Sequence, residues 1–184
     1  MAFTRDSRGP RRGDRGGRRD DEQKEFEQRT LDLARVTRVT KGGKRMRFRA
    51  CVVIGDHKGR VGFGLAKGTD VSMSVNKAAR KAQKRLIRVP IVGGTIPHAI
   101  REKFGAAVVL LKPAPKGTGI KAGGATRVVL ELAGVPNVVS KSLGSSNKIN
   151  NVRATLAALQ NLTMNVKEKR REKSSEAPPE SVEA

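Results

Sequence analysis

Apolar and polar residues alternate along residues 45–54, where every second side chain is apolar. A period of two is typical of a β-strand that buries one face and exposes the other. The apolar face is Met46, Phe48, Ala50, Val52 and Ile54, and the other face begins with Arg45, Arg47 and Arg49. The Val- and Thr-rich run Leu31 to Lys41 predicts a preceding strand. The turn Lys41-Gly42-Gly43-Lys44 then joins the two strands in a hairpin with a basic tip.

A third strand and a helix are predicted after this hairpin. The strand runs from Arg60 to Ala66, and the helix is capped by Thr69, Asp70 or Ser72. At about 100° per residue, one sector of the helix is apolar; it holds Val71, Val75, Ala78, Ala79, Ala82 and Leu86. The complementary sector holds Lys77, Arg80, Lys81, Lys84, Arg85 and Arg88. We expect the apolar face to pack on the sheet and the cationic face to point away from it.

A second unit is predicted in the following part of the chain. Residues 89–105, with Pro90 and Gly93-Gly94, are interpreted as a linker or irregular hairpin. The predicted elements are then a strand at Ala106 to Leu111, a glycine-rich loop at 116–124, a short helix at Arg127 to Ala133 ended by Gly134, a strand at Val135 to Leu143, and a last helix capped by Ser145, Ser146 or Asn147. The last helix has apolar positions at Val152, Leu156, Leu159 and Leu162. The pattern predicts an α+β protein of two small domains.

The charge of the chain indicates what kind of partner the protein binds. The 184 residues hold 39 Lys and Arg against 17 Asp and Glu, a formal net charge of +22. Between residues 28 and 163 the only acids are Asp32, Asp56, Asp70, Glu102 and Glu131. Such a surplus repels itself in a compact fold unless a polyanion neutralises it. Nucleic acid is the first candidate partner, an anionic membrane the second, and a solvated charged surface without a partner the third.

The two ends of the chain have a different composition from the middle. Residues 1–19 contain seven Arg among many Gly and almost no apolar side chains, which predicts a disordered basic arm. A short acidic patch, Asp20 to Glu27, follows it. From Lys167 onward, acidic and basic residues mix with Ser and Pro, which predicts a polar tail. No apolar run approaches the length of about 20 residues that a membrane-spanning helix requires.

Few residues offer catalytic or metal chemistry. The histidines His57 and His98 lie in turn-like sequence without nearby clusters of Cys, Asp or Glu, so neither a metal nor a cofactor is expected. Cys51, the single cysteine, falls in a strand and is expected to be a small buried hydrophobe in a reducing cytoplasm. The loop Gly117 to Gly124 does not match the phosphate-binding P-loop pattern. Its glycines form either tight turns or a bare backbone that approaches RNA or a partner chain.

Several segments in order resemble one known family, that of the fifth protein of the small ribosomal subunit. In the first half they are Gly43-Lys44, Phe48-Arg49-Ala50, Val53-Ile54-Gly55-Asp56, Gly59-Arg60-Val61-Gly62-Phe63-Gly64, and Asp70-Val71 through Val75 to Ala78. In the second half they are Gly117-Thr118-Gly119-Ile120, Ala122-Gly123-Gly124, Val129-Leu130-Glu131-Leu132-Ala133-Gly134-Val135 and Asn150-Asn151-Val152-Arg153-Ala154-Thr155. The resemblance runs from about residue 30 to 163. Ser74 stands where the family pattern usually has Ala.

The resemblance implies a domain plan. The first domain is a β-β-β-α unit similar to double-stranded-RNA-binding domains, and the second is a left-handed β-α-β unit of the α/β sandwich type. The expected ranges are 1–27 for the arm and acidic patch, 28–95 for the first domain, 96–165 for the second, and 166–184 for the tail. The second domain shares its outline with some small-molecule kinases, which implies no activity.

The resemblance also implies partners and site residues. Members of the family bind small-subunit ribosomal RNA, contact the fourth and eighth proteins of the subunit, and affect the accuracy of decoding. We expect the RNA contacts at Lys41, Lys44, Arg45, Arg47, Arg49, Lys116, Lys121 and Arg127. The hairpin tip corresponds to the family's site of spectinomycin resistance and comprises Thr40, Lys41, Gly42, Gly43, Lys44 and Arg45. The glycines of the loop that faces the fourth protein are Gly117, Gly119, Gly123 and Gly124.

We therefore expect a structural, RNA-binding component of the small ribosomal subunit without catalytic activity, a small-molecule substrate or a membrane. Lysine and arginine suit A-form RNA, because its base edges are hidden and proteins read its shape, phosphates and 2′-hydroxyls. Two other classes stay open. One is an enzyme acting on phosphorylated small molecules through the second domain, which lacks an acid–base cluster. The other is a basic protein on anionic lipid, which would need a helix with bulky apolar residues.

Overall fold

The computed structural model describes residues 26–162. The basic arm and the polar tail that the sequence predicts at the two ends lie outside the described residues, as does most of the acidic patch. Within the described range the chain forms two antiparallel-rich sheets and three helices, so the α+β class is confirmed.

The first sheet contains four antiparallel strands in sequential order. They are β1 (Glu27–Thr40), β2 (Gly43–Gly55), β3 (Arg60–Gly68) and β4 (Leu86–Arg88). Thr40 pairs with Gly43, so the predicted hairpin and its tip are confirmed. Helix α2 (Val71–Gln83) follows β3, and of the three predicted caps it is Asp70 whose carboxylate accepts a hydrogen bond from the N–H of Ser72.

The predicted helix is too long at its end. Leu86 and Arg88, assigned to its two faces from the sequence, belong instead to β4, which pairs with β3. The unpaired edge of β3 supplies hydrogen-bond partners for this segment, and nothing in the local sequence marks that edge.

The second sheet has the order β5–β6–β8–β7. Its strands are β5 (Ile100–Phe104), β6 (Ala107–Pro113), β7 (Ile120–Lys121) and β8 (Val138–Gly144), with β7 parallel to β8 and the other pairs antiparallel. Helix α3 (Gly124–Ala133) connects β7 to β8, and α4 (Lys148–Gln160) follows β8. Gly134 ends α3 in the left-handed conformation and Asn147 caps α4, as predicted.

The segment 89–105 is not wholly a linker. Residues Ile100–Phe104 within it are strand β5, which forms a hairpin with β6, because Ile100 and Leu111 pair across the two strands and the turn lies at Gly105. Only the short bridge between Val92 and Thr95 fits the irregular hairpin that the sequence indicates.

The burial of strand β2 changes along its length as well as between its two faces. Residues 43–47 are exposed on both faces, whereas residues 50–55 are buried on both. The inner half lies between two layers: Ala50, Val52 and Ile54 pack with α2, while Val53 belongs to the core of the second domain. The period of two therefore predicted the correct apolar face but missed the second buried one, and Met46 is 54% exposed.

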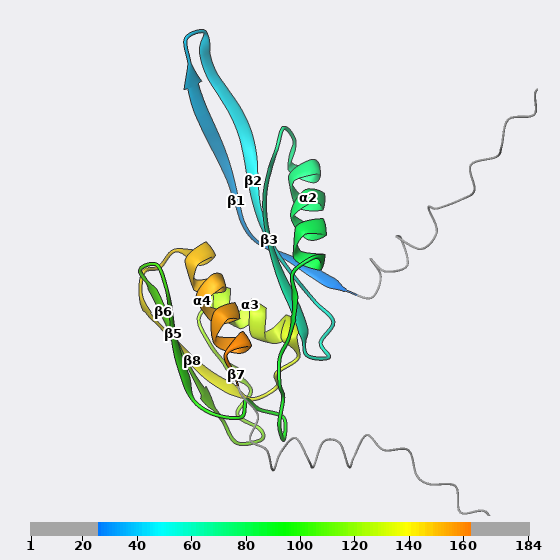
Figure 1. The fold of residues 1–184 in the computed structure, drawn as a ribbon, viewed down its shortest axis with the longest axis vertical. Helices are drawn as coiled ribbons and strands as arrows, with labels where there is room; N and C mark the ends of the chain where they lie inside the picture. The colour runs from blue at the N-terminus through cyan, green and yellow to red at the C-terminus, as the bar shows by residue number, and fades with distance from the viewer. Residues whose placement is uncertain (1–25, 163–184) are drawn as a thin grey trace, which may run out of the picture.

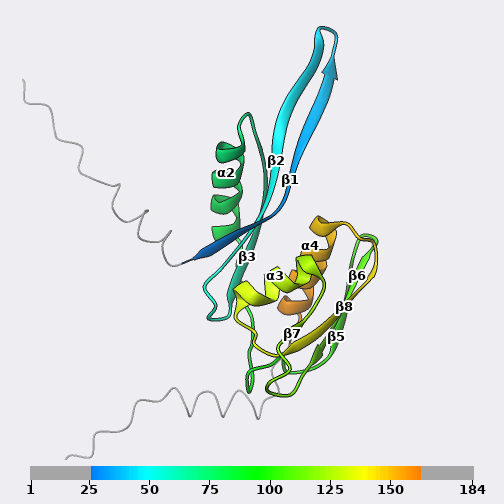
Figure 2. The ribbon, with the colours of Figure 1, turned by 180° about the vertical axis from the view of Figure 1, so that it is seen from behind.

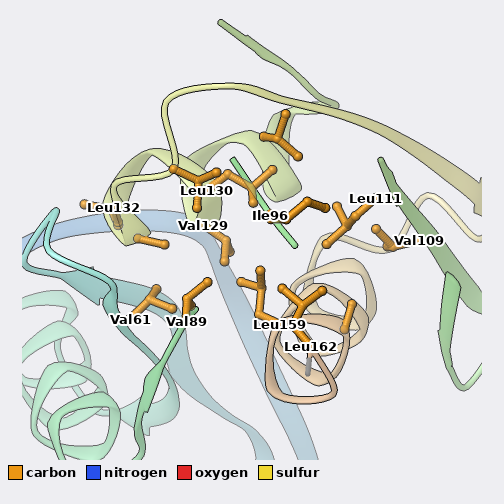
Figure 3. Close-up of a cluster of buried hydrophobic side chains, with 14 of the residues drawn as sticks. Val61, Val89, Ile96, Val109, Leu111, Val129, Leu130, Leu132, Leu159 and Leu162 are labelled. Carbon is orange, nitrogen blue, oxygen red and sulfur yellow. The ribbon is translucent and has the colours of Figure 1, made fainter. Parts of the chain in front are cut away.

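The two domains share one of the two hydrophobic cores of the described residues. Val61 of β3 and Val89 pack in the same buried cluster as Val129 and Leu130 of α3 and Leu159 of α4, as Figure 3 shows. On the opposite face of β3, Gly64 lets α2 approach so closely that any Cβ there would overlap the carbonyl of Ala78. The first sheet is thus covered by α2 on one face and by α3 and α4 on the other (Figures 1 and 2).

Candidate nucleic-acid interface

The β1–β2 hairpin extends far beyond the rest of the molecule (Figure 1). The predicted tip residues Thr40 to Arg45 are all exposed, and the hydroxyl of Thr40 donates a hydrogen bond of 3.0 Å to the carbonyl of Gly43. The side chains of Val39 and Met46 are 72% and 54% exposed, so the outer hairpin buries no core of its own. Its surface is therefore available on both faces.

The strand register places four arginines on one face of the hairpin. Arg45, Arg47 and Arg49 alternate along β2, as predicted, and Arg38 of β1 lies directly opposite Arg45. This face is continuous with Val53 and so points to the side of the second domain. Arg38 was missed by the sequence analysis, although counting back from the two-residue turn would have paired it with Arg45.

Arg49 differs from the other three because it lies at the base of the hairpin. Its Nη2 is 3.6 Å from Oδ2 of Asp32, and Nζ of Lys148 in α4 is 3.4 Å from the other carboxylate oxygen of Asp32. The Nε of Arg49 is buried without a hydrogen-bond partner among the described residues. Arg49 is therefore partly committed to the boundary between the domains, whereas Arg38, Arg45 and Arg47 form no ion pair within residues 26–162.

All six acidic residues of the described range are engaged within the protein. Three lie at the boundary between the domains: Glu27 pairs with Arg29 and His57, Asp32 with Arg49 and Lys148, and Glu131 with Arg29 and Arg127. The other three have local partners: Asp56 pairs with Arg60, Asp70 caps α2, and Glu102 accepts a hydrogen bond from Asn161. None lies on the outer hairpin, residues 36–47, so every charged side chain exposed there is cationic.

Three of the carboxylates, those of Glu27, Asp56 and Asp70, have lowered pKa values because of these partners. The hydrogen bond from His57, followed by that from Arg29, lowers the pKa of Glu27. Burial alone would raise the pKa of Asp56, but hydrogen bonds from the Arg60 side chain and from the N–H groups of Lys58 and Arg60 outweigh it and leave the pKa lowered. The hydroxyl of Ser72 lowers the pKa of Asp70.

The glycine loop is anchored by one buried residue, Asn137. Its Oδ1 accepts hydrogen bonds from the N–H groups of Gly117 at 3.0 Å and Gly119 at 3.2 Å, and its Nδ2 donates to the carbonyl of Gly94. The backbone N–H groups at these two positions are therefore not bare, which corrects the interpretation of this part of the loop as an open backbone cradle. Sequence analysis missed Asn137, because its partners are distant in sequence.

The remaining loop residues are arranged around the start of α3. Lys116 and Lys121 are exposed, as are Gly123 and Gly124 at the first turn of the helix. Arg127 is exposed but its Nε lies 2.8 Å from Oε1 of Glu131, one turn later. Lys116 and Lys121 are thus the predicted RNA contacts in this region whose charge has no acidic partner among residues 26–162.

The predicted residues form separate surfaces rather than one site. The hairpin tip lies at one end of the long axis of the molecule, and β7, within the glycine loop, lies toward the other end (Figures 1 and 2). A third cationic surface lies on α2 and the turn after it, where Lys77, Arg80, Lys81, Lys84 and Arg85 are exposed. A polyanion that contacts all three would have to extend along the molecule.

No group of three or more His, Cys, Asp or Glu residues within 26–162 could hold a metal ion. Cys51 is buried, as predicted, and burial raises the pKa of its thiol to about 11. No helix among the described residues has the length and apolarity needed to cross a membrane.

Comparison with protein families matches both domains. Residues 26–90 match the N-terminal domain of ribosomal protein S5, and residues 102–172 match the C-terminal domain of the same protein. The chain belongs to the ribosomal protein S5 family. Since both domains match in order and cover most of the chain, the resemblance found in the sequence is confirmed.

Membership of the S5 family sets the general role of the protein. It is a structural protein of the small ribosomal subunit and acts in translation, at the ribosome. The family is structural rather than enzymatic. In this protein the geometry described above distinguishes three separate surfaces, on the hairpin, on the glycine loop and on α2.

Proposed function

We propose that the protein binds small-subunit ribosomal RNA through the arginine face of its hairpin and the exposed cations of α2. The observation that carries the proposal is the pairing of Arg38 with Arg45, two like charges directly opposite in the sheet. Like charges in this position destabilise a strand pair. A phosphate backbone between or above them would remove the repulsion, whereas no acid of the described residues does so.

The chemistry of the hairpin suits an RNA backbone. Guanidinium groups form paired hydrogen bonds with phosphates. The strands carry no aromatic side chain beyond Phe48, so the hairpin would follow the shape of the RNA rather than stack on many bases. Contacts of this kind fix the position of a protein on RNA and carry little sequence information.

The dependence of RNA affinity on salt tests this proposal. Each phosphate contact releases bound cations, so affinity should fall steeply between low and physiological ionic strength. Arg45→Gln should weaken binding to small-subunit ribosomal RNA roughly tenfold and reduce the slope of log affinity against log salt by about 0.7 to 0.9. Arg101→Gln, an exposed arginine on β5, is the matched control. Salt-independent binding by the unchanged protein would refute the proposal.

We also propose that the hairpin tip determines sensitivity to spectinomycin and that the glycine loop faces the fourth protein of the subunit and thereby influences accuracy. Gly42 and Gly124 provide a matched pair of tests. Neither has a positive φ, and a Cβ at either position would meet no atom within 4 Å, so substitution should leave the fold intact. Gly42→Lys should alter inhibition by spectinomycin without changing misreading, and Gly124→Lys should do the reverse.

If both substitutions change the same readout, or neither changes any, the assignment of the two surfaces is wrong. The contact with the eighth protein has no matched surface among these residues; it is proposed on family resemblance, and cross-linking within assembled subunits would locate it. We further infer that the protein works in a reducing cytoplasm, since Cys51 is buried and has no second cysteine with which to pair.

A further inference from the structure

A pocket of about 380 Å³ lies between the start of β1 and the second half of α2. It is separate from the hairpin tip and from the glycine loop. Figures 1 and 2 both show the first strand passing beside this end of the helix. We propose that this pocket binds one unpaired nucleotide of the ribosomal RNA, with the base inside and its phosphate on the cations of α2. The inference rests on the proposed RNA-binding function and assigns it a specific base-binding site.

Part of the inner surface of the pocket is apolar and suits the face of a flat ring. Ile54, 2% exposed, and the half-buried Ala79 contribute apolar surface, and Phe26 forms a further part of the wall. The guanidinium of Arg60 lies 5.2 Å from the centre of the Phe26 ring, and Asp56 holds Arg60 through an ion pair of 2.6 Å. The ring is therefore positioned in advance, as a base-binding surface requires.

The polar lining consists of three side-chain amides and one cation, Arg80. Gln28, Asn76 and Gln83 each present a side-chain amide to the pocket. Within residues 26–162 none of these three amides hydrogen-bonds to another group of the protein. An amide offers a donor beside an acceptor, which is the pattern found on the edges of bases. A site for phosphate alone would need only cations.

The cations stand where the backbone of such a nucleotide would pass. Asn76, Arg80 and Gln83 are spaced i, i+4 and i+7, so they lie along one face of α2. Lys77 and Lys84 form the adjacent stripe, and both are exposed. No acidic residue lines the pocket. A base held by the amides would place its phosphate beside this stripe, and splayed-out bases of this kind are the usual targets of specific RNA recognition.

The test compares two RNA probes with the full-length chain. The probes are transcribed small-subunit ribosomal RNA from the source organism and a fully paired RNA duplex. The double variant Asn76→Ala/Gln83→Ala should bind the ribosomal RNA roughly tenfold more weakly, while its affinity for the duplex and its salt slope stay unchanged. Lys77→Ala, the matched control on the same helix, should weaken both probes and reduce the salt slope.

The outcomes separate this inference from the proposed function. If the unchanged protein binds ribosomal RNA without salt dependence, the proposed function fails. If it binds normally and the double variant binds equally well, or loses affinity for both probes equally, only the nucleotide pocket fails. Equal thermal unfolding of the variants is checked first.

A second measurement does not depend on a loss of affinity. Phe26 is replaced by photoreactive benzoylphenylalanine, and the protein is assembled into small subunits and irradiated. A cross-link to one defined nucleotide supports the pocket. A cross-link to another ribosomal protein, or to residues 20–25 of the chain itself, shows that a protein segment occupies it and overturns the inference.

Discussion

The guanidinium of Arg29 lies 3.0 Å from the carboxylate of Glu131, although the two residues are 102 positions apart in the chain. Arg29 is near the start of β1 and Glu131 is in α3, so the ion pair crosses the boundary between the domains. Two backbone hydrogen bonds lie beside it, from the N–H of His57 to the carbonyl of Leu132 at 3.0 Å and from Gly59 to Ala133 at 2.9 Å. The end of α3 is thus tied directly to the first sheet.

The Arg29–Glu131 pair should contribute only modestly to stability. Arg29 is 48% exposed and Glu131 25%, and exposed pairs typically contribute about 0.2 to 1 kcal/mol. A double-mutant cycle with Arg29→Ala and Glu131→Ala, measured by urea unfolding, should give a coupling in that range that falls with added salt. Arg127→Ala is the control, since it removes a pair within α3 alone. A coupling unaffected by salt would argue against this account.

Gly134 should be the position at which the domain boundary is most sensitive to substitution. Its φ is +77°, and a Cβ there would overlap the backbone of His57. Gly134→Ala should lower the free energy of unfolding by about 3 kcal/mol or more, because strain and backbone overlap add. Gly117→Ala is the matched control: its φ is +92° but its surroundings are open, so only about 1 kcal/mol of strain is expected. Equal losses in urea unfolding would contradict the role of the overlap.

Asn137 should hold the glycine loop in place. Asn137→Ala removes one acceptor from two N–H groups and one donor from the Gly94 carbonyl, and each such hydrogen bond contributes about 0.5–1.5 kcal/mol. We expect a loss of about 3 kcal/mol in stability, with faster hydrogen exchange at Gly117 and Gly119. Asn161→Ala, which breaks one exposed hydrogen bond to Glu102, should have a much smaller effect. Unaltered exchange at both glycines would exclude the anchoring role.

Asp56 should contribute to the loss of stability in acid. Because its pKa in the folded protein is lowered from 3.8, the ionised carboxylate adds stability above that pH, and the contribution disappears as the pH falls through the lowered pKa. Asp56→Asn should cost about 1–3 kcal/mol at pH 6, since the side chain is only 4% exposed. The stability curves of variant and unchanged protein should converge over the acidic range below 3.8, the ordinary pKa of an aspartate. Curves that stay parallel down to that range would show that the charge is not involved.

Arg45 should have opposite effects on free stability and on binding. Without RNA, Arg45→Gln relieves the repulsion from Arg38. The free energy of unfolding of the free protein should therefore be unchanged or higher by up to about 0.5 kcal/mol. Its affinity for RNA should nevertheless fall. A variant that is both clearly less stable and equally good at binding would show that the arginine face serves the fold instead.

The parts of the fold that depend on near neighbours were predictable. The hairpin turn, the Asp70 cap of α2, the end of α3 at Gly134 and the cap of α4 at Asn147 each depend on interactions within about five residues. The same holds for the arginines of β2, because a strand turns successive side chains to opposite faces.

The parts of the fold that depend on residues distant in the sequence were not predictable. Strand β4 exists because an edge of β3 is free, and the two-sided burial of β2 exists because the second domain packs on it. Asn137 gathers partners from two segments that are distant in sequence, at Gly94 and at Gly117 to Gly119. No local pattern encodes such contacts.

The sign and size of the charge were determined by the sequence alone, since they depend only on which residues are present. The tertiary structure decided where the charge acts. Folding brings Glu27, Asp32 and Glu131 to the boundary between the domains, where partly screened ion pairs are favoured, and keeps them away from the hairpin tip and from the exposed face of α2. Because charges interact through space rather than along the chain, only the folded arrangement turns an overall excess into cationic surfaces.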